Sequence, residues 1–578
     1  MLCVSSALAL LIAFQAPQQT TDSLDRVIRR EMGRREIPGL SIAIVDSGRI
    51  VFARGYGMTK RGGSAVTDQT LFQAGSISKP VTAVAAMRLV SRGVLKLDRD
   101  VNEQLVSWKL RDTSVADGEK VTARMLMSHS AGLNVHGFPG YALTEPLPTA
   151  VQVLNGGKPV NTPAVRIEQK PGAQWSYSGG GYTILQVLMS DVAKRPFADL
   201  MQEEVLTPAG MTASTYAQPL PATHATRAAT GHYADGSEVV GGWHSYPEMA
   251  AAGLWTTASD LARFAIAFQN AYRRMPDGIV TADIAGQMLS YQRNDFQGLG
   301  FALRGNNRRM EFAHNGRDEG FDASFSATAA TRQAVVIMIN ANDNSGAVER
   351  IRKVVATLYG WPNERPAPLP PRAVSVSAQQ LASVAGRYEM RNNRMAAFEV
   401  FDGQLMLMVD GKPDDEFVVT GADDVTRVDG VVTLHFLRDS AGKVTGFESR
   451  DEGGTRRIPR VGPIATTITP TADPDRKRTA TFDALLRAMA AGKAADHRAM
   501  LAPGALRQFS GQVVPDLVGV SAVRYLGEED VSGRGIERHG GRVARIVYLG
   551  VMIAKNSRVV LVHLTGEGLV TDYDVVVR

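Results

Sequence analysis

The sequence predicts an α+β fold, in which an antiparallel sheet flanked by helices is followed by a small antiparallel β-barrel and a C-terminal α+β domain. Three observations support this prediction. Strand patterns stand at both ends of a long first segment whose middle is mainly helical. Two linkers, at 363–376 and 463–475, divide the 578 residues. Short strands fill the segment between the linkers.

The first domain is predicted over 20–362. Residues 22–34 place apolar side chains at helical spacing. LSIAIVDSGRIVFARGYG, residues 40–57, reads as two strands joined by an Asp-Ser-Gly turn. A second strand pair is expected at 321–340, followed by a helix at 345–360. The sheet is thus assembled from the two ends of the domain, with helices and loops between them.

The later segments are separated by linkers. ERPAPLPPR contains four prolines and favours an extended connection. Residues 377–462 read as short strands with Asp-Gly and Ser-Ala-Gly-Lys turns, which predicts a barrel or sandwich. Residues 476–578 form the predicted C-terminal domain. It should begin with a helix that has one apolar face and end in three Val/Ile-rich strands; the face comprises Phe482, Leu485, Leu486 and Met489, and the strands are 543–552, 558–565 and 569–577.

The N-terminus has the features of a secretory signal peptide. Residues 4–14 are almost all apolar, and Ala16 could precede a cleavage site, so we expect 1–16 to be removed. The alternative is a buried N-terminal helix. The only cysteine, Cys3, lies in this segment, so the mature chain would have no disulfide and no thiol nucleophile. We therefore expect a periplasmic or secreted protein with no stable membrane span.

Composition excludes several kinds of partner. The net charge of +6 is small for this length and no basic run is present, so a nucleic-acid partner is not expected. The scattered histidines do not have metal-ligand spacing, and no cofactor motif is recognised; they include His136, His224, His232 and His244. We expect a small-molecule or peptide substrate, no metal and no cofactor. The sequence leaves the oligomeric state open.

The stretch FQAGSISKPVTA, residues 72–83, contains a candidate nucleophile. Ser76 and Lys79 are one helical turn apart and share a face at the start of a predicted helix. A serine hydroxyl needs a base to become nucleophilic, and free N–H groups at a helix start suit an oxyanion. A lysine with its ordinary pKa of about 10.4 is a poor base near pH 7, so a second group is worth seeking. Two unrelated surface residues are the alternative.

Two further segments carry candidate partners. Tyr177 lies in KPGAQWSYSGGGYTILQVL, just before three glycines that allow close backbone approach. His314 lies in MEFAHNGRDEGFDASFSA, where His-Asn-Gly is expected to end one strand before the next strand pair. Gly316 would let a bound acyl group lie along that strand. Taken alone, Tyr177 could be a packed loop residue and His314 a surface residue at a turn.

The order Ser-x-x-Lys, Tyr loop and His-x-Gly resembles the serine β-lactamase and penicillin-recognising superfamily. The chain is most similar to the branch that holds class C β-lactamases, D-alanyl-D-alanine carboxypeptidases, D-aminopeptidases and esterases. VTARMLMSHSAGL, PGAQWSYSGGGY, GLWTTASDLARF and GLGFAL also match that branch, and the resemblance covers about 20–360. It implies a β-lactamase-like fold and, for 380–462, a lipocalin-like accessory barrel.

The resemblance also implies roles for individual residues. Ser76 would be the acylated nucleophile, and Lys79 and Tyr177 would share the general-base role. His314 stands where class C β-lactamases have a lysine, and it is expected to take part in catalysis by donating to a carboxylate or assisting proton transfer. The backbone N–H groups of Ser76 and Arg317 would form an oxyanion hole. Together these roles imply an acyl-enzyme.

Two departures from the family pattern bear on the substrate. Gly179 stands where the family often has an asparagine whose amide holds an acylamido group, and His314 replaces a lysine. Gly179 is therefore expected at the substrate-binding site, without that amide. His129, in the SHSAGL loop, is interpreted as structural. The leading hypothesis is a secreted serine hydrolase acting on ester or peptide bonds, including peptides with D-residues. The alternatives are a true β-lactamase and a non-catalytic sensor or binding protein.

Overall fold

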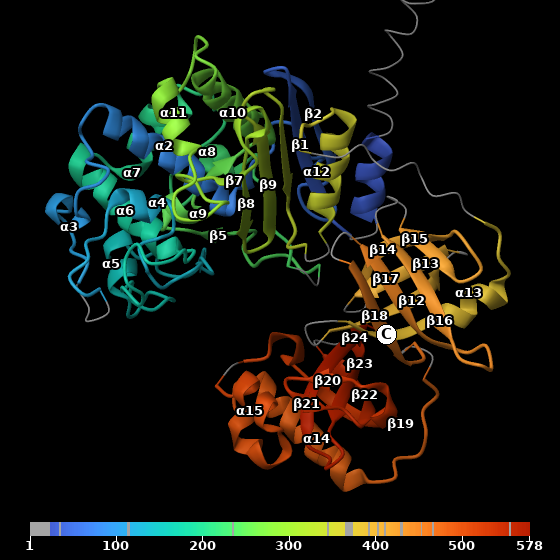
Figure 1. Ribbon diagram of the computed structural model, residues 1–578. Coiled ribbons are helices and arrows are strands. Elements are labelled where there is room, and N and C mark those ends of the chain that lie inside the picture. The colour runs from blue at the N-terminus through green and yellow to red at the C-terminus, as the bar shows by residue number, and fades with distance from the viewer. Residues whose placement is uncertain are drawn as a thin grey trace, which may run out of the picture. The chain divides into compact units, whose positions relative to one another are not determined.

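The computed structural model describes residues 24–577, except for short gaps at 34–35, 112–115, 234–235, 344–345, 364–373, 391–393, 402–403, 410–411, 428–431, 452–453, 465–467, 512 and 554–555. The chain divides into two compact units, one up to residue 366 and the other from residue 367 (Figure 1). The proposed signal peptide 1–16, Cys3 and most of the predicted linker 363–376 lie outside the described residues, so these stay predictions.

The first unit contains a six-stranded antiparallel sheet in the order β2-β1-β10-β9-β8-β7. Both predicted strand pairs are confirmed, and the two ends of the domain meet where Leu40 pairs with Ile339. The strands are β1 Gly39–Asp46, β2 Arg49–Gly57, β7 Ala302–Arg304, β8 Glu311–Asp318, β9 Phe321–Thr328 and β10 Ala334–Ile339. The sheet therefore joins segments almost 300 residues apart in the sequence.

Helices cover both faces of this sheet (Figure 1). Ile42 and Ile44 on β1 pack with the helix over 24–33 and with α12 Ala347–Leu358. Ala43 and Val45 point the other way, into the large core that also contains α10 Ala258–Tyr272. Because successive strand residues face opposite sides, covering both faces explains why this strand is an almost unbroken apolar run.

The helical region holds α2 Ser78–Ser91 at its centre. This helix is buried on nearly all sides, which fits the small and apolar residues that make up most of its sequence. Two further helices packed nearby are α6 Gly179–Ala193 and α9 Met249–Ala252. The shorter elements of this region are α3 Val101–Gln104, α4 Ala123–Met127, α5 Ala150–Asn155, α7 Phe197–Met201, α8 Ala222–Ala225, α11 Ala282–Met288, β3 Phe72–Gln73, β4 Tyr141–Ala142, β5 His244–Ser245 and β6 Trp255–Thr256.

The second unit begins with α13 Ala378–Val384 and a closed antiparallel barrel. Its strands are β11 Gly386–Met390, β12 Arg394–Phe401, β13 Gln404–Val409, β14 Lys412–Val419, β15 Asp424–Arg427, β16 Thr433–Arg438, β17 Val444–Asp451 and β18 Gly454–Gly462. Aromatic rings fill the interior, where Phe398 packs edge-on against Tyr388, Phe436 and Phe447. The barrel that the sequence predicted is thus present.

The C-terminal part of the second unit is α+β, as predicted. The expected apolar face of α14 Arg476–Ala490 packs with α15 Pro503–Phe509 onto a four-stranded sheet. The sheet has the order β19-β22-β23-β24, with bounds β19 Ser521–Asp530, β22 Arg545–Ile553, β23 Asn556–Leu564 and β24 Val570–Val577. The strand β19 was not predicted, because its sequence SAVRYLGEED is polar. In the structure, its pairing with β22 is interrupted by two register shifts.

No helix in the described part of the chain is both long and apolar enough to cross a membrane.

Candidate active site

One cleft of about 570 Å³ in the first unit brings most of the predicted site residues together. Ser76, Tyr177, His314, Gly316 and Arg317 all line it. The elements that supply them are the start of α2, the loop before α6, and β8. The three segments that the sequence singled out therefore meet at one place.

Ser76 lies in a single 3₁₀ turn, Gly75–Ile77, that leads into α2. Gly75 has a φ of +51°, and a Cβ there would come within 2.5 Å of the Arg317 amide nitrogen. Only glycine fits both the backbone conformation and the space. The turn can therefore lie directly against β8, which places the amide nitrogen of Arg317 next to the serine.

Lys79 lies one turn further along and is 2% exposed. Its Nζ donates to the Oγ of Ser76 at 2.9 Å and to the carbonyl oxygen of Ala251 at 2.8 Å. The same nitrogen lies 5.0 Å from the ring centre of Tyr177 and 5.7 Å from that of Tyr182. The lysine is thus buried, fixed in direction and in contact with the candidate nucleophile.

Tyr177 is held in place by His129. The two rings are in contact, with centres 4.3 Å apart and planes tilted by 34°. The backbone N–H of Ser176 donates to the carbonyl of His129 at 2.7 Å, and that of Ser178 donates to its Nδ1 at 3.1 Å. Burial, with the nearby charge of Lys79, lowers the pKa of His129 well below its usual value, which agrees with a neutral ring that accepts this bond. His129 therefore fixes the tyrosine loop on both sides.

The Tyr177 hydroxyl makes no hydrogen bond to Ser76 or Lys79 in the described structure. Its ring nonetheless lies beside the lysine nitrogen. The lysine is thus the group in contact with the serine, and the tyrosine lies beside the lysine and lines the same cleft as the serine.

His314 lies in the middle of β8, so the prediction that His-Asn-Gly ends a strand was wrong. The strand runs on to Asp318 and stays paired with β9, where His314 faces Phe325. The sequence suggested an end because the residues become polar there. These polar residues mark the point where β8 loses one neighbour, because the short β7 pairs with it only as far as Ala313. From His314 onward the strand edge has no pairing from β7, and it lies beside the cleft.

The ring of His314 is uncharged at neutral pH. Burial and the nearby charge of Lys79 lower its pKa to about 4. Its Nδ1 donates to the carbonyl of Asn315 at 2.6 Å, and its ring centre lies 6.2 Å from that of Tyr177. This position therefore does not supply the positive charge that a lysine would.

Gly316 and Arg317 place the backbone of β8 against the nucleophile turn. A Cβ on Gly316 would collide with the carbonyl oxygen of Ala74. The guanidinium of Arg317 is held by both carboxylate oxygens of Asp322 at 2.6 Å and donates to the carbonyl of Asp343 at 3.0 Å. Because the Arg317 guanidinium is bound to Asp322 and Asp343, the backbone amide nitrogens of Arg317 and Ser76 are the groups suited to bind an oxyanion.

Gly179 does not contribute to the cleft in the way that the sequence suggested. It is the first residue of α6 and is absent from the residues that line the cleft. A Cβ there would come within 2.8 Å of the Phe138 ring, so that ring fills the space a longer side chain would need. The expected substrate-binding position is therefore buried packing.

Sequence reasoning missed two buried carboxyl groups of the first unit. Glu248 directly precedes α9, the helix whose Ala251 carbonyl accepts from Lys79. Burial raises the pKa of Glu248 to about 8. Burial also raises the pKa of Asp318, at the end of β8, well above its usual value. No spacing in the sequence connects these acids to Ser76, because only the fold brings their segments together.

Comparison with known proteins decides the family. A model of the Beta-lactamase family matches residues 24–359, which is more than half of the chain. The chain belongs to the beta-lactamase family. The match ends close to the boundary between the two units, so the second unit lies outside it.

Relatives of this family member include an esterase. Esterase EstB of Burkholderia gladioli is 28% identical over 203 residues, which is 32% of this chain and 49% of that protein. Protein flp of Staphylococcus aureus strain N315 is 27% identical over 251 residues, or 42% of this chain and 46% of that protein. The chain thus spans about half the length of these curated relatives.

A solved structure shares the fold. The octameric penicillin-binding protein homologue from Pyrococcus abyssi has a TM-score of 0.52 and 22% identity, and the match covers 76% of this chain and 99% of that one. At this identity the likeness concerns the fold alone.

Proposed function

We propose that this protein is a serine hydrolase that cleaves ester or peptide bonds through an acyl-enzyme on Ser76. The observation that carries the proposal is the 2.9 Å hydrogen bond between Nζ of Lys79 and Oγ of Ser76, at the start of a helix and beside a strand edge. A nucleophile in contact with a base, and next to N–H donors, is the arrangement that acyl transfer needs.

In the proposed reaction, Oγ of Ser76 attacks the substrate carbonyl carbon while Lys79, assisted by Tyr177, takes its proton. The amide N–H groups of Ser76 and Arg317 stabilise the negative oxygen that develops. The same base returns the proton to the leaving alcohol or amine, which departs and leaves the acyl group on the serine. Water then attacks, the acid is released and the hydroxyl of Ser76 is restored.

We propose further that esters are better substrates than β-lactams. The neutral ring of His314 offers no cation to the carboxylate of a β-lactam. The Phe138 ring beside Gly179 leaves no room for the amide side chain that would bind an acylamido group. The similarity to an esterase over part of the chain supports this preference.

The test is pre-steady-state kinetics with p-nitrophenyl butyrate. A rapid release of p-nitrophenol, followed by slower turnover and accompanied by a butyryl adduct on the intact protein, is the expected result. Ser76→Ala should show neither. A wild-type protein that binds substrates but forms no adduct with any ester, peptide or β-lactam would instead be a binding protein.

A further inference from the structure

The leaving group and the acyl group of a substrate must occupy opposite ends of the cleft. This reasoning rests on the proposed function. The leaving group must receive a proton from the base, so its atom has to lie on the side of Ser76 where Lys79 and Tyr177 stand. The acyl group then points along β8, away from Tyr177. Each strand residue advances about 3.3 Å, so Arg317 lies about 10 Å beyond His314.

Two aromatic rings form a wall on the Tyr177 side. Trp175 is 37% exposed and Phe296 is 41% exposed, although both line the cleft. Their ring centres are 5.1 Å apart in an edge-to-face arrangement, and the ring of Trp175 lies 6.3 Å from that of Tyr177. Large aromatic side chains left open to solvent inside a cleft are a common basis for ligand binding.

The one polar side-chain atom of these two residues already has a hydrogen-bond partner within the protein. Nε1 of Trp175 donates to Oε1 of Gln297 at 3.3 Å. Gln297 is itself held, because its Nε2 donates to the carbonyl groups of Gly298 and Phe301. The wall therefore presents ring surface to the cleft, and the buried side-chain amide of Gln297 holds Trp175 in place.

The charged side chains that line the cleft lie at its other end. The charged residues that line it are Arg317, Asp322, Asp343 and Glu349, and all belong to the end of β8 and the segments beside it. Arg317 is the one cation among the described lining residues, and it is paired with Asp322. At the Tyr177 end the lining consists of aromatic rings, Gln297, Ala302 and the His314 ring.

We propose that Trp175 and Phe296 form a leaving-group subsite for an uncharged aromatic or apolar alcohol. Substrates would be esters whose alcohol part lies on these rings. Leaving groups that carry a carboxylate, such as the C-terminal residue of a peptide, would be disfavoured because no cation among the described residues lines this end. Lys79 is buried, does not line the cleft and is already bonded to Ser76 and Ala251. This preference would differ from that of a carboxypeptidase, whose leaving group carries a carboxylate.

The test uses three esters that share one acyl group. Phenyl, 2-naphthyl and 3-carboxyphenyl butyrate give the same butyryl-enzyme, so only the steps up to departure of the alcohol differ, and kcat/KM reports these steps. In the wild type, kcat/KM should be highest for the naphthyl ester and at least about 10-fold lower for the carboxyphenyl ester than for the phenyl ester.

Variants of the wall should change the ratio between substrates. Trp175→Ala and Phe296→Ala should each lower the naphthyl-to-phenyl ratio of kcat/KM by about 5-fold, the scale of one aromatic contact. Trp175→Phe should recover part of it. The deacylation rate of the shared butyryl-enzyme serves as the reference for general damage to the site. Trp175→Ala could disturb the Tyr177 loop and so slow deacylation as well. Phe296 lies on a separate segment, so in that case the substrate ratio of Phe296→Ala tests the subsite.

The outcomes separate this inference from the proposed function. If no butyryl adduct forms on Ser76 with any ester, the proposed function fails. If the adduct forms but Phe296→Ala leaves the naphthyl-to-phenyl ratio unchanged, or the carboxyphenyl ester is the best of the three, the subsite is overturned while the hydrolase assignment stands.

Discussion

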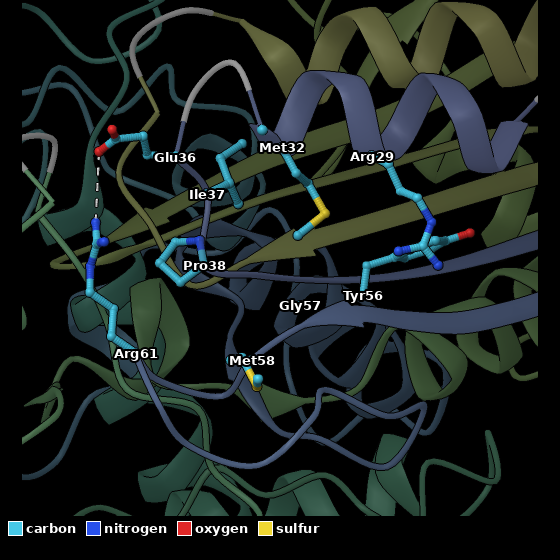
Figure 2. Close-up of a pocket in the computed structure, with 10 residues that line it drawn as sticks. Arg29, Met32, Glu36, Ile37, Pro38, Tyr56, Gly57, Met58 and Arg61 are labelled. Atoms are coloured by element: carbon cyan, nitrogen blue, oxygen red, sulfur yellow. Dashed lines mark ion pairs between the residues drawn. The ribbon is translucent and has the colours of Figure 1, made fainter.

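Two pockets of the first unit are nearly equal in volume yet differ in chemistry. The cleft over Ser76 measures about 570 Å³, and a second pocket, between the helix over 24–33 and β2, measures about 540 Å³. Figure 2 shows the second pocket, where Arg29 lies over the ring of Tyr56 and Arg61 pairs with Glu36. Both pockets combine aromatic rings with basic side chains.

The difference lies in what the polar groups contact. In the second pocket the guanidinium of Arg61 pairs with an exposed carboxylate at 3.8 Å, an arrangement that contributes little energy. In the cleft, the buried Nζ of Lys79 contacts the Ser76 oxygen at the start of a helix. Pocket size therefore does not identify the reactive site here; the burial of a base beside a nucleophile does.

The largest effect should come from removing the nucleophile. Ser76→Ala should lower kcat for p-nitrophenyl butyrate at least about 10³-fold, as loss of nucleophiles generally does, while the fold is kept because a single oxygen is lost. Met58→Ala, in the second pocket, is the matched control and should leave kcat unchanged. Equal losses in both variants, or near-normal activity of Ser76→Ala, would show that the cleft is not the reactive site.

The two candidate base residues should act as one unit. Lys79→Ala and Tyr177→Phe should each lower kcat at least about 10²-fold, because proton transfer from Ser76 depends on both. The double variant should lose much less than the product of the two, since groups that work together are non-additive. A double-mutant cycle measured with p-nitrophenyl butyrate checks this, and strictly multiplicative losses would mean that the two residues work independently.

The buried carboxyl group of Glu248 should make stability depend on pH. The pKa of Glu248 is raised from its ordinary 4.5 to about 8, so the native state keeps a proton that the unfolded chain loses between these values. The free energy of unfolding therefore falls as pH rises from 4.5 to 8. In Glu248→Gln, the fall between pH 5 and pH 8 should be smaller by about 3 kcal/mol, or on the order of 10²-fold in the unfolding equilibrium.

Urea unfolding followed by tryptophan fluorescence measures this effect. All five tryptophans lie before residue 366, so the signal reports the first unit. Glu36→Gln, whose carboxylate is exposed at the second pocket, is the control and should keep the wild-type pH dependence. An unchanged slope in Glu248→Gln would mean that the glutamate is not protonated in the native state.

The smallest expected effect concerns charge at position 314. The pKa of His314 is held near 4, so the wild type has no cation for a leaving-group carboxylate above about pH 5. His314→Lys should raise kcat/KM for nitrocefin relative to p-nitrophenyl butyrate by about 10-fold, the scale of one charge-assisted hydrogen bond. In the wild type, nitrocefin should be the poorer substrate. A wild type that prefers nitrocefin by more than about 10-fold would instead support a β-lactamase.

Sequence reasoning predicted the elements with strong local patterns. The β1–β2 hairpin, the β9–β10 pair, α12 and the apolar face of α14 follow directly from periodicity and turn residues. The three motifs that carry Ser76, Tyr177 and His314 were also found, although each is ambiguous alone, because their order along the chain resembles that of a known superfamily.

What the sequence could not predict depends on contacts between distant segments. Trp175 and Phe296 are neighbours only after folding, and the Phe138 ring occupies the space beside Gly179 for the same reason. The open edge of β8 follows from the shortness of β7, which no pattern within β8 reveals. Likewise, the raised pKa of Glu248 reflects burial among other elements.

Covalent labelling with a fluorophosphonate probe tests the central claim most directly. After digestion, peptide mass mapping should find one adduct, on Ser76, in the wild type and in Met58→Ala. The adduct should be absent from Ser76→Ala and strongly slowed in Lys79→Ala, because the lysine activates the serine. An adduct on another residue, or equal labelling rates in the wild type and Lys79→Ala, would contradict the account.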